Sequence, residues 1–89
     1  MATMIVQFQV KDFTQWKTVF EMGDGLRKEN GEKSHTIYQD ADDPNSVTNI
    51  MEWDSLDKGK AFFQSAELRA KLAESGMIGA PKISYLKKS

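Results

Sequence analysis

The sequence predicts an α+β protein of the split-βαβ, or ferredoxin-like, plan, in which helices cover one face of a four-stranded antiparallel sheet. Two of its segments alternate apolar and polar residues with the period of a strand, and two others repeat apolar residues with the period of a helix. These segments follow the order β-α-β-β-α-β, which is the third observation. The expected strands are residues 3–10, 33–40, 46–53 and 82–86, and the expected helical regions are 13–30 and 56–75.

The first strand and helix are indicated by a change of period near Asp12. Residues 3–10 read "TMIVQFQV", with Met4 and the alternate residues after it on one face. Asp12 is a suitable helix N-cap, and Gln15 is its capping-box partner. The helix is predicted to end at Gly31, with glycines weakening its middle. Its apolar face holds Phe13, Trp16, Val19 and Phe20.

The second and third strands are joined by the turn sequence "ADDPN", residues 41–45. Asp40, Asp42 and Asn45 are oxygen ligands of the kind that calcium prefers, but the EF-hand spacing fails, because its glycine and final glutamate positions hold Asn45 and Met51. The turn interpretation is therefore preferred, and we expect no metal site.

The second helical region is predicted to begin after Asp54 or Ser55, either of which can act as N-cap, and to restart at Ser65. Gly76 suits the position that ends it. After residues 77–81, "KISYL" forms the last strand.

Both faces of the predicted sheet carry apolar residues, although helices can cover only one of them. Ile5, Ile50 and Leu86 point away from the main apolar set of their strands. Scattered surface hydrophobes would also explain these residues. Because so small a domain gains from a partner, we predict instead a homodimer whose two sheets face each other as an α+β barrel.

Composition narrows the classes of function. The 89 residues form one domain, residues 1–89. A formal charge of −1 argues against nucleic-acid binding, and the third strand lacks the RNA-recognition motif. The absence of cysteine excludes disulfides and thiolate chemistry. No apolar run is long enough for a membrane span and no signal peptide is evident, so a cytoplasmic protein is expected.

Asn49 is the polar residue that the sequence explains least. In "NIMEW" it shares a strand face with Met51 and Trp53, where a buried amide without a partner costs about 1–3 kcal/mol. Either a neighbouring backbone satisfies this amide or it points at a ligand. Tyr38 and Tyr85 are candidates to add phenol groups to such a pocket, which would suit a phenol, aromatic ketone or quinone-like compound.

The other candidate residues have simpler structural interpretations. Trp16 and Phe63 belong to the helical core pattern and are also candidate walls of a cavity. His35, the only histidine, is a candidate base or haem ligand but more commonly would be a half-exposed strand residue. The basic residues are interpreted as a solvated surface. Arg27 and Arg69 are candidates to hold an anionic substrate, but nothing in the sequence pairs either of them with a site.

Four stretches, "VKDFTQWKTVF", "YQDADDPNSV", "MEWDSLDKGKAFFQSAEL" and "GMIGAPKISYL", resemble the dimeric α+β barrel superfamily, in particular its small antibiotic-biosynthesis-monooxygenase-like proteins. The resemblance implies a cofactor-independent oxygenase in which Asn49 hydrogen-bonds a substrate oxygen, favours its enolate and holds dioxygen nearby, while Trp53 walls the pocket. The tyrosine and arginine that assist in such oxygenases have no matching positions here. The histidine that haem-degrading relatives carry on the second helix is also absent, which argues against haem degradation.

Three functions remain open. The favoured one is a cofactor-free monooxygenase acting on a small aromatic or quinone-type compound. The alternatives are a non-catalytic dimer that binds a small molecule, and a dimer whose apolar faces serve assembly alone.

Overall fold

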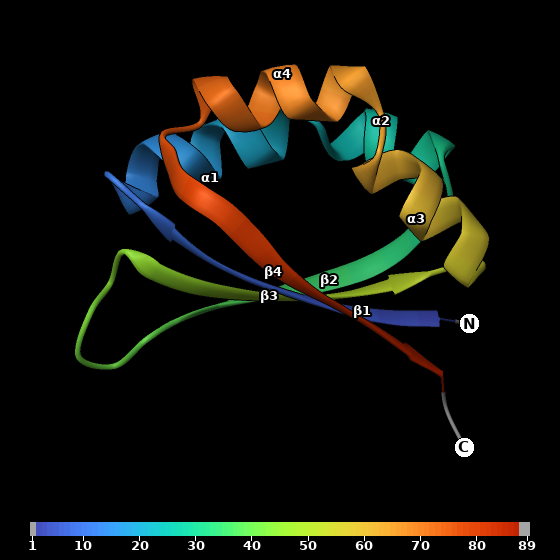
Figure 1. Ribbon diagram of the computed structural model, residues 1–89, viewed down its shortest axis with the longest axis horizontal. Helices are drawn as coiled ribbons and strands as arrows, with labels where there is room; N and C mark the ends of the chain where they lie inside the picture. The colour runs from blue at the N-terminus through green and yellow to red at the C-terminus, as the bar shows by residue number, and fades with distance from the viewer. Residues whose placement is uncertain (1, 88–89) are drawn as a thin grey trace.

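The computed structural model describes residues 2–87, apart from the side chains of Ala66, Glu67 and Leu72. Its four strands form one antiparallel sheet in the order β2-β3-β1-β4, which confirms the predicted plan (Figure 1). The elements are β1 (Ala2–Val10), α1 (Phe13–Met22), α2 (Asp24–Glu29), β2 (Glu32–Gln39), β3 (Ser46–Trp53), α3 (Leu56–Phe63), α4 (Ala66–Glu74) and β4 (Met77–Lys87).

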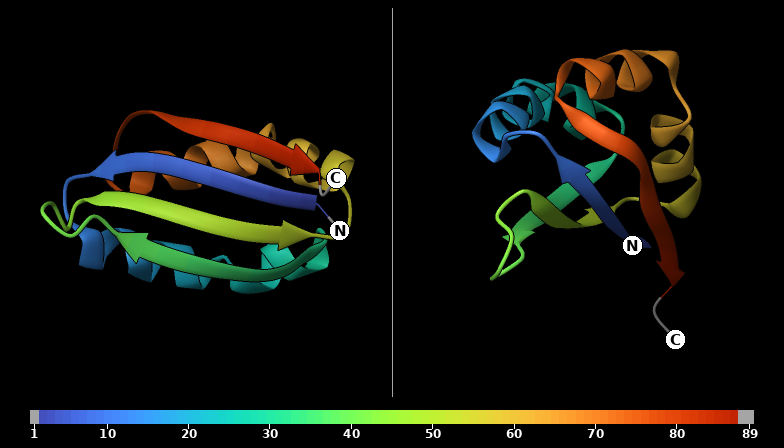
Figure 2. Two further views of the ribbon diagram at one scale, coloured as in Figure 1. Left: turned by 90° about the horizontal axis from the view of Figure 1, so that it is seen from below. Right: turned by 60° about the vertical axis from the view of Figure 1, so that its left-hand side comes forward.

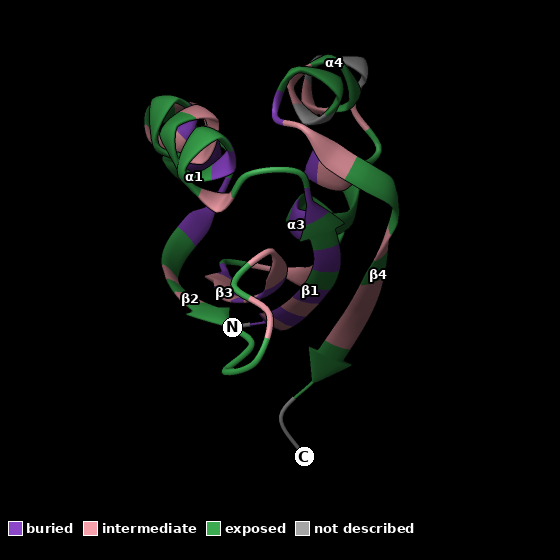
Figure 3. Cartoon of the chain, turned by 90° about the vertical axis from the view of Figure 1, so that its left-hand side faces the viewer, coloured by how far each residue is buried: buried purple, intermediate pink, exposed green. Residues whose placement is uncertain are grey.

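All four helices lie on the same side of the sheet, and the core lies between these two layers (Figure 1). Burial alternates along β1 and β3 with the period of a strand, as the banded β1 ribbon shows (Figure 3). The fully buried side chains Met4, Val10, Val47, Met51 and Trp53 all come from the helix-facing side of these two central strands. Strand periodicity therefore places the core where the sequence predicts it.

The first helical region is divided in two at Gly23, which follows from the weak helix propensity of its glycines. Asp12 caps α1 by accepting a hydrogen bond from the Thr14 backbone N–H at 2.9 Å. The prediction of a capping box is wrong, because the Gln15 amide donates instead to the Glu74 carbonyl, at 3.4 Å. This hydrogen bond connects α1 to the end of α4. The chain turns into β2 through Gly31, whose φ of 115° favours glycine.

The turn between β2 and β3 is held together by side-chain hydrogen bonds. Asp40 Oδ2 accepts from two backbone N–H groups of the turn, at 3.0 and 3.1 Å. The Asn45 amide accepts from the Phe13 N–H at 3.1 Å and donates to the Lys11 carbonyl at 3.3 Å. The hairpin is thereby fixed to the start of α1.

The second helical region restarts as predicted. Ser55 caps α3 by accepting from the Lys58 N–H, and Ser65 accepts from the Leu68 N–H at the start of α4. Gly76 ends the region with a φ of 82°.

The last strand begins at Met77, so the predicted range 82–86 is too short at its start. Its pairing with β1 shifts register between Gln7 and Gln9. Gly79, with a φ of 71°, and Pro81 are accommodated there because β4 is an edge strand whose outer side needs no hydrogen-bond partner.

The other face of the sheet has no helix over it, as the view from below shows (Figure 2). Ile5 and Ile50 are cross-strand partners on this face, and Leu86 is 42% exposed beside them on β4. The second apolar face is thus confirmed, while the partner that would cover it stays a prediction. Among the described residues, no helix is both long and apolar enough to cross a membrane.

Candidate functional site

A pocket lies between the helix-facing side of the sheet and the four helices. It contains about 590 Å³ of space free of atoms, including the part that opens to solvent. Most of its described lining is aliphatic or aromatic, and the polar side chains in that lining are Arg27, Asn49, Lys71 and Ser75. An apolar cavity with a few polar groups is the usual form of a small-molecule site.

Asn49 forms part of the pocket's floor, on β3 between its cross-strand neighbours Val6 and Ile37. Only 3% of the residue is exposed. Its Oδ1 atom is buried and has no hydrogen-bond partner among the described residues. No described backbone group satisfies this oxygen, which leaves a bound water or a ligand group as its partner.

Aromatic rings from α1, α3 and β1 wall the pocket. On the α1 side, the Trp16 ring lies 5.0 Å from the Phe8 ring and stacks 5.0 Å from the Phe20 ring at 23°. On the α3 side, the Phe62 and Phe63 rings meet edge to face at 5.7 Å. Trp16 and Phe63 therefore both line the pocket, where the sequence placed them as candidates.

Trp53 lies behind this wall rather than in the lining. Its side chain is fully buried, with its ring 5.3 Å from that of Phe62 and 6.4 Å from that of Phe63. Its Nε1 has no hydrogen-bond partner among the described residues. Four residues of strand separate Trp53 from Asn49, or about 13 Å. The two side chains therefore do not meet at one reacting atom.

The two tyrosines are not brought together with Asn49. Tyr38 is 54% exposed and pairs with Thr48 on the open face of the sheet, so it points away from the pocket. Tyr85 is on the helix-facing side of β4 and packs against the core. The Nζ of Lys60 lies 5.2 Å from the centre of its ring. Tyr85 is not part of the described lining of the pocket.

Arg27 is a pocket residue that the sequence does not reveal, and its assignment to a solvated surface is wrong. Its side chain is 6% exposed and its Nε donates to Glu32 Oε2 at 3.0 Å. Its Nη1 donates to the Phe20 carbonyl at 2.6 Å, and its guanidinium lies 3.6 Å from the centre of the Phe20 ring. One guanidinium therefore caps the end of α1 and fixes an aromatic wall of the pocket.

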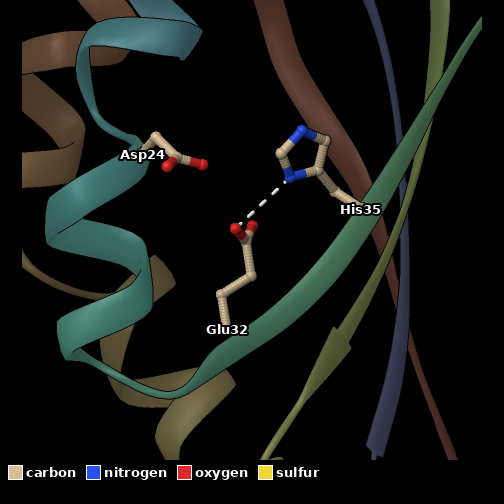
Figure 4. Close-up of side chains that lie close together, drawn as sticks. All are labelled: Asp24, Glu32 and His35. Carbon is tan, nitrogen blue, oxygen red and sulfur yellow. Dashed lines mark hydrogen bonds and ion pairs between the residues drawn. The ribbon is translucent and has the colours of Figure 1, made fainter.

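Glu32, the ion-pair partner of Arg27, also lies close to Asp24 of α2 and His35 of β2 (Figure 4). One ligand-type atom from each lies within 4.8 Å of the others, and His35 Nδ1 is 3.3 Å from Glu32 Oε1. The Lys28 ammonium, 3.0 Å from Asp24, holds the pKa of that carboxyl below its usual value. Because Arg27 and Lys28 already balance the two carboxylates, little charge is left to attract a divalent cation.

Lys71 and Ser75 reach the pocket from α4 and the turn that follows it. With Leu68 they are spaced i, i+3 and i+7, which places all three on one helical face. Arg69, the other basic residue considered from the sequence, is exposed and is not in the described lining.

The sequence matches the family model for antibiotic biosynthesis monooxygenases over residues 1–73. It matches no curated protein. Among solved structures, it is similar to SnoaB of Streptomyces nogalater, with 16% identity, a TM-score of 0.80, and 99% of this chain and 92% of that chain covered. It is also similar to ActVA-Orf6 of Streptomyces coelicolor, with 24% identity, a TM-score of 0.68, and 99% of this chain and 87% of that chain covered. The family model spans most of the 89 residues, so the chain belongs to the antibiotic biosynthesis monooxygenase family.

Proposed function

We propose that the pocket binds a small planar aromatic or quinone-type compound and that the protein is a cofactor-independent monooxygenase acting on it. The observation that carries the proposal is the buried, unpartnered Oδ1 of Asn49 on the floor of an apolar pocket. A phenol or enol hydroxyl of a ligand can donate to this oxygen, and the amide N–H₂ can donate to a ligand carbonyl.

The chemistry follows from this placed amide. A hydrogen bond from the Asn49 amide N–H₂ to a ketone oxygen stabilises the enolate that forms when a carbon conjugated with that ketone loses a proton to water, which later returns a proton to the peroxide. Dioxygen then adds to that carbon, and the resulting hydroperoxide loses water, so that a CH₂ group plus O₂ becomes a C=O group plus H₂O. The substrate supplies all the electrons, and no external reductant is consumed.

Similar proteins favour this chemistry over other small-molecule functions. SnoaB is described as a cofactor-independent oxygenase, and ActVA-Orf6 is a monooxygenase whose structure holds the ligand nanaomycin D. The Asn49 amide is an uncharged group of the described lining that can donate to a ligand oxygen while also accepting from a ligand hydroxyl.

The remaining candidate residues take supporting roles in the proposal. Trp16 and Phe63 contact the flat faces and edges of the ligand, because both line the pocket. Trp53 supports the pocket indirectly, through its packing on the phenylalanines that form the wall. The substrate contacts expected of Tyr38 and Tyr85 would require geometry other than that of the single chain.

The assembly proposed is a homodimer formed through the open face of the sheet, with Ile5 and Ile50 at its centre. Burial of this apolar face on a second copy would compensate for the small core of one chain. The cytoplasmic location expected from the sequence stays a prediction.

Oxygen consumption with 1,8-dihydroxyanthrone, measured above its uncatalysed oxidation, tests the function. Wild type should consume about one O₂ per anthrone and yield the anthraquinone, and Asn49→Ala should lower kcat by about 10²-fold, as loss of one placed donor does elsewhere. The exposed Asn30, whose amide donates only to the Leu26 carbonyl of its own helix, supplies the matched control Asn30→Ala. Unchanged turnover in Asn49→Ala would contradict the proposal. Ligand binding without turnover in the wild type would identify the non-catalytic binding dimer instead.

A further inference from the structure

The charged groups that face the pocket are all cationic. Arg27 and Lys71 belong to its described lining, which includes no aspartate or glutamate. In an apolar cavity an ammonium or guanidinium interacts strongly with a ligand charge unless the protein already neutralises it. The question is therefore which of these two cations is left for a ligand.

The charge of Arg27 is used within the protein. Its Nε lies 3.0 Å from Glu32 Oε2, and the side chains of Arg27 and Glu32 are 6% and 0% exposed. Its Nη2 lies 3.5 Å from Asp24 Oδ1. Its Nη1 donates a hydrogen bond to the Phe20 carbonyl. Arg27 therefore shapes the wall of the pocket and presents little net charge to it.

Lys71 differs from Arg27 in each of these respects. It is half-buried on the inward stripe of α4, between Leu68 and Ser75, where an amphipathic helix normally places apolar residues. Lys71 has no ion-pair partner among the described side chains, and of the described lysines without one (Lys11, Lys60, Lys71, Lys82 and Lys87) it is the one that lines the pocket. A lysine on the inner face of a helix, with no anion beside it among the described side chains, is suited to bind an anion that comes with the ligand.

We infer that the pocket selects an aromatic ligand that carries an ionised carboxylate, and that Lys71 is the residue that recognises this group. The inference rests on the proposed ligand class and adds its charge. The aromatic body of the ligand lies among the rings of the walls, its hydroxyl or carbonyl meets Asn49, and its carboxylate lies toward α4.

A pair of probes that differ in charge tests this inference. 1-Hydroxy-2-naphthoic acid is an anion at pH 7, and its methyl ester keeps the same ring system and hydroxyl without the charge. Isothermal titration calorimetry should show that wild type binds the acid about tenfold more tightly than the ester, as expected for one charge-assisted hydrogen bond in a partly buried site. The preference should shrink as salt is raised.

Lys71→Met removes the charge and keeps the length of the side chain. It should weaken binding of the acid about tenfold and leave binding of the ester unchanged. Lys17→Met is the matched control, because Lys17 is 50% exposed on α1 and pairs with Glu21. This control changes the net charge equally and should not alter either affinity.

Three results would overturn the inference: a wild type that does not prefer the acid, a preference that survives in Lys71→Met, or no binding of the acid at millimolar concentration. Equal weakening of both probes in Lys71→Met would also count against it, because that result indicates damage to the pocket. These outcomes are separate from failure of the proposed reaction, since the carboxylate preference is a property of binding and Asn49→Ala tests turnover.

Discussion

Replacing Asn49 by leucine should make the protein more stable while it abolishes turnover. Oδ1 of Asn49 is buried without a partner, so the folded state has lost the hydration of this amide and gained no hydrogen bond in return. Leucine is close to asparagine in size, and its apolar side chain would continue the apolar floor formed by Val6 and Met51. A residue kept at a cost to stability is typical of a functional site.

The magnitude follows from the burial of this side chain. A buried polar group without a partner costs about 1–3 kcal/mol. Leucine replaces the amide oxygen and nitrogen by two methyl groups that are only somewhat larger, so the overpacking penalty beside the pocket is small and the net gain should be about 1 kcal/mol or more. For a domain of this size, 1 kcal/mol corresponds to a rise in Tm of roughly 4–8 °C.

Asn45 supplies the opposite case within the same chain. Its amide accepts from the Phe13 N–H and donates to the Lys11 carbonyl, so Asn45→Leu should lower the free energy of unfolding by about 1–2 kcal/mol. Urea unfolding of both variants at one protein concentration, without ligand, gives the comparison. A loss of 1 kcal/mol or more in Asn49→Leu would refute the argument, because it would show that the folded protein already satisfies the amide.

Two further predictions concern the pocket wall and the assembly. Arg27→Met leaves Glu32 buried without its cation and should lower the free energy of unfolding by about 3–5 kcal/mol. Adding Glu32→Met should recover at least half of that loss. Urea unfolding that shows no recovery in the double variant would contradict a role of the ion pair. Ile50→Glu places a charge at the centre of the open sheet face and should convert a two-chain mass into a one-chain mass in native mass spectrometry; a two-chain mass in Ile50→Glu would place the interface elsewhere.

Local pattern was enough to predict most of the fold. The alternation in residues 46–53 predicts both ends of β3, because one face of that strand is buried and the other is not. Gly76 was predicted to end the second helical region and does so with a positive φ that favours glycine, whereas Gly23, with a φ of −90°, divides a region that the sequence predicted as one helix weakened by glycines. The early start of β4 was missed because Gly79 and Pro81 usually mark a loop, and only pairing with β1 makes them part of an edge strand.

The candidate site was less predictable. The strand period predicted which face of the sheet carries Asn49. It also predicted that the buried amide needs either a backbone partner or a ligand. The unpartnered Oδ1 favours a ligand. The burial of Arg27 and Glu32 could not be inferred, because both residues lie at ends of elements where charged residues are normally solvated, and they are buried only when α2 packs on β2. Lys71 was equally hidden, since a single lysine on a helix predicts exposure.

The most direct test of the central claim observes the Asn49 amide itself. In ¹⁵N-labelled protein titrated with 1-hydroxy-2-naphthoic acid, the side-chain NH₂ signals of Asn49 can be assigned by their loss in Asn49→Leu. We predict that these signals shift to saturation together with the indole N–H of Trp16, while those of Asn45, fixed in the hairpin, do not move. Saturable binding that leaves the Asn49 amide unshifted would contradict the claim that this residue reads the ligand.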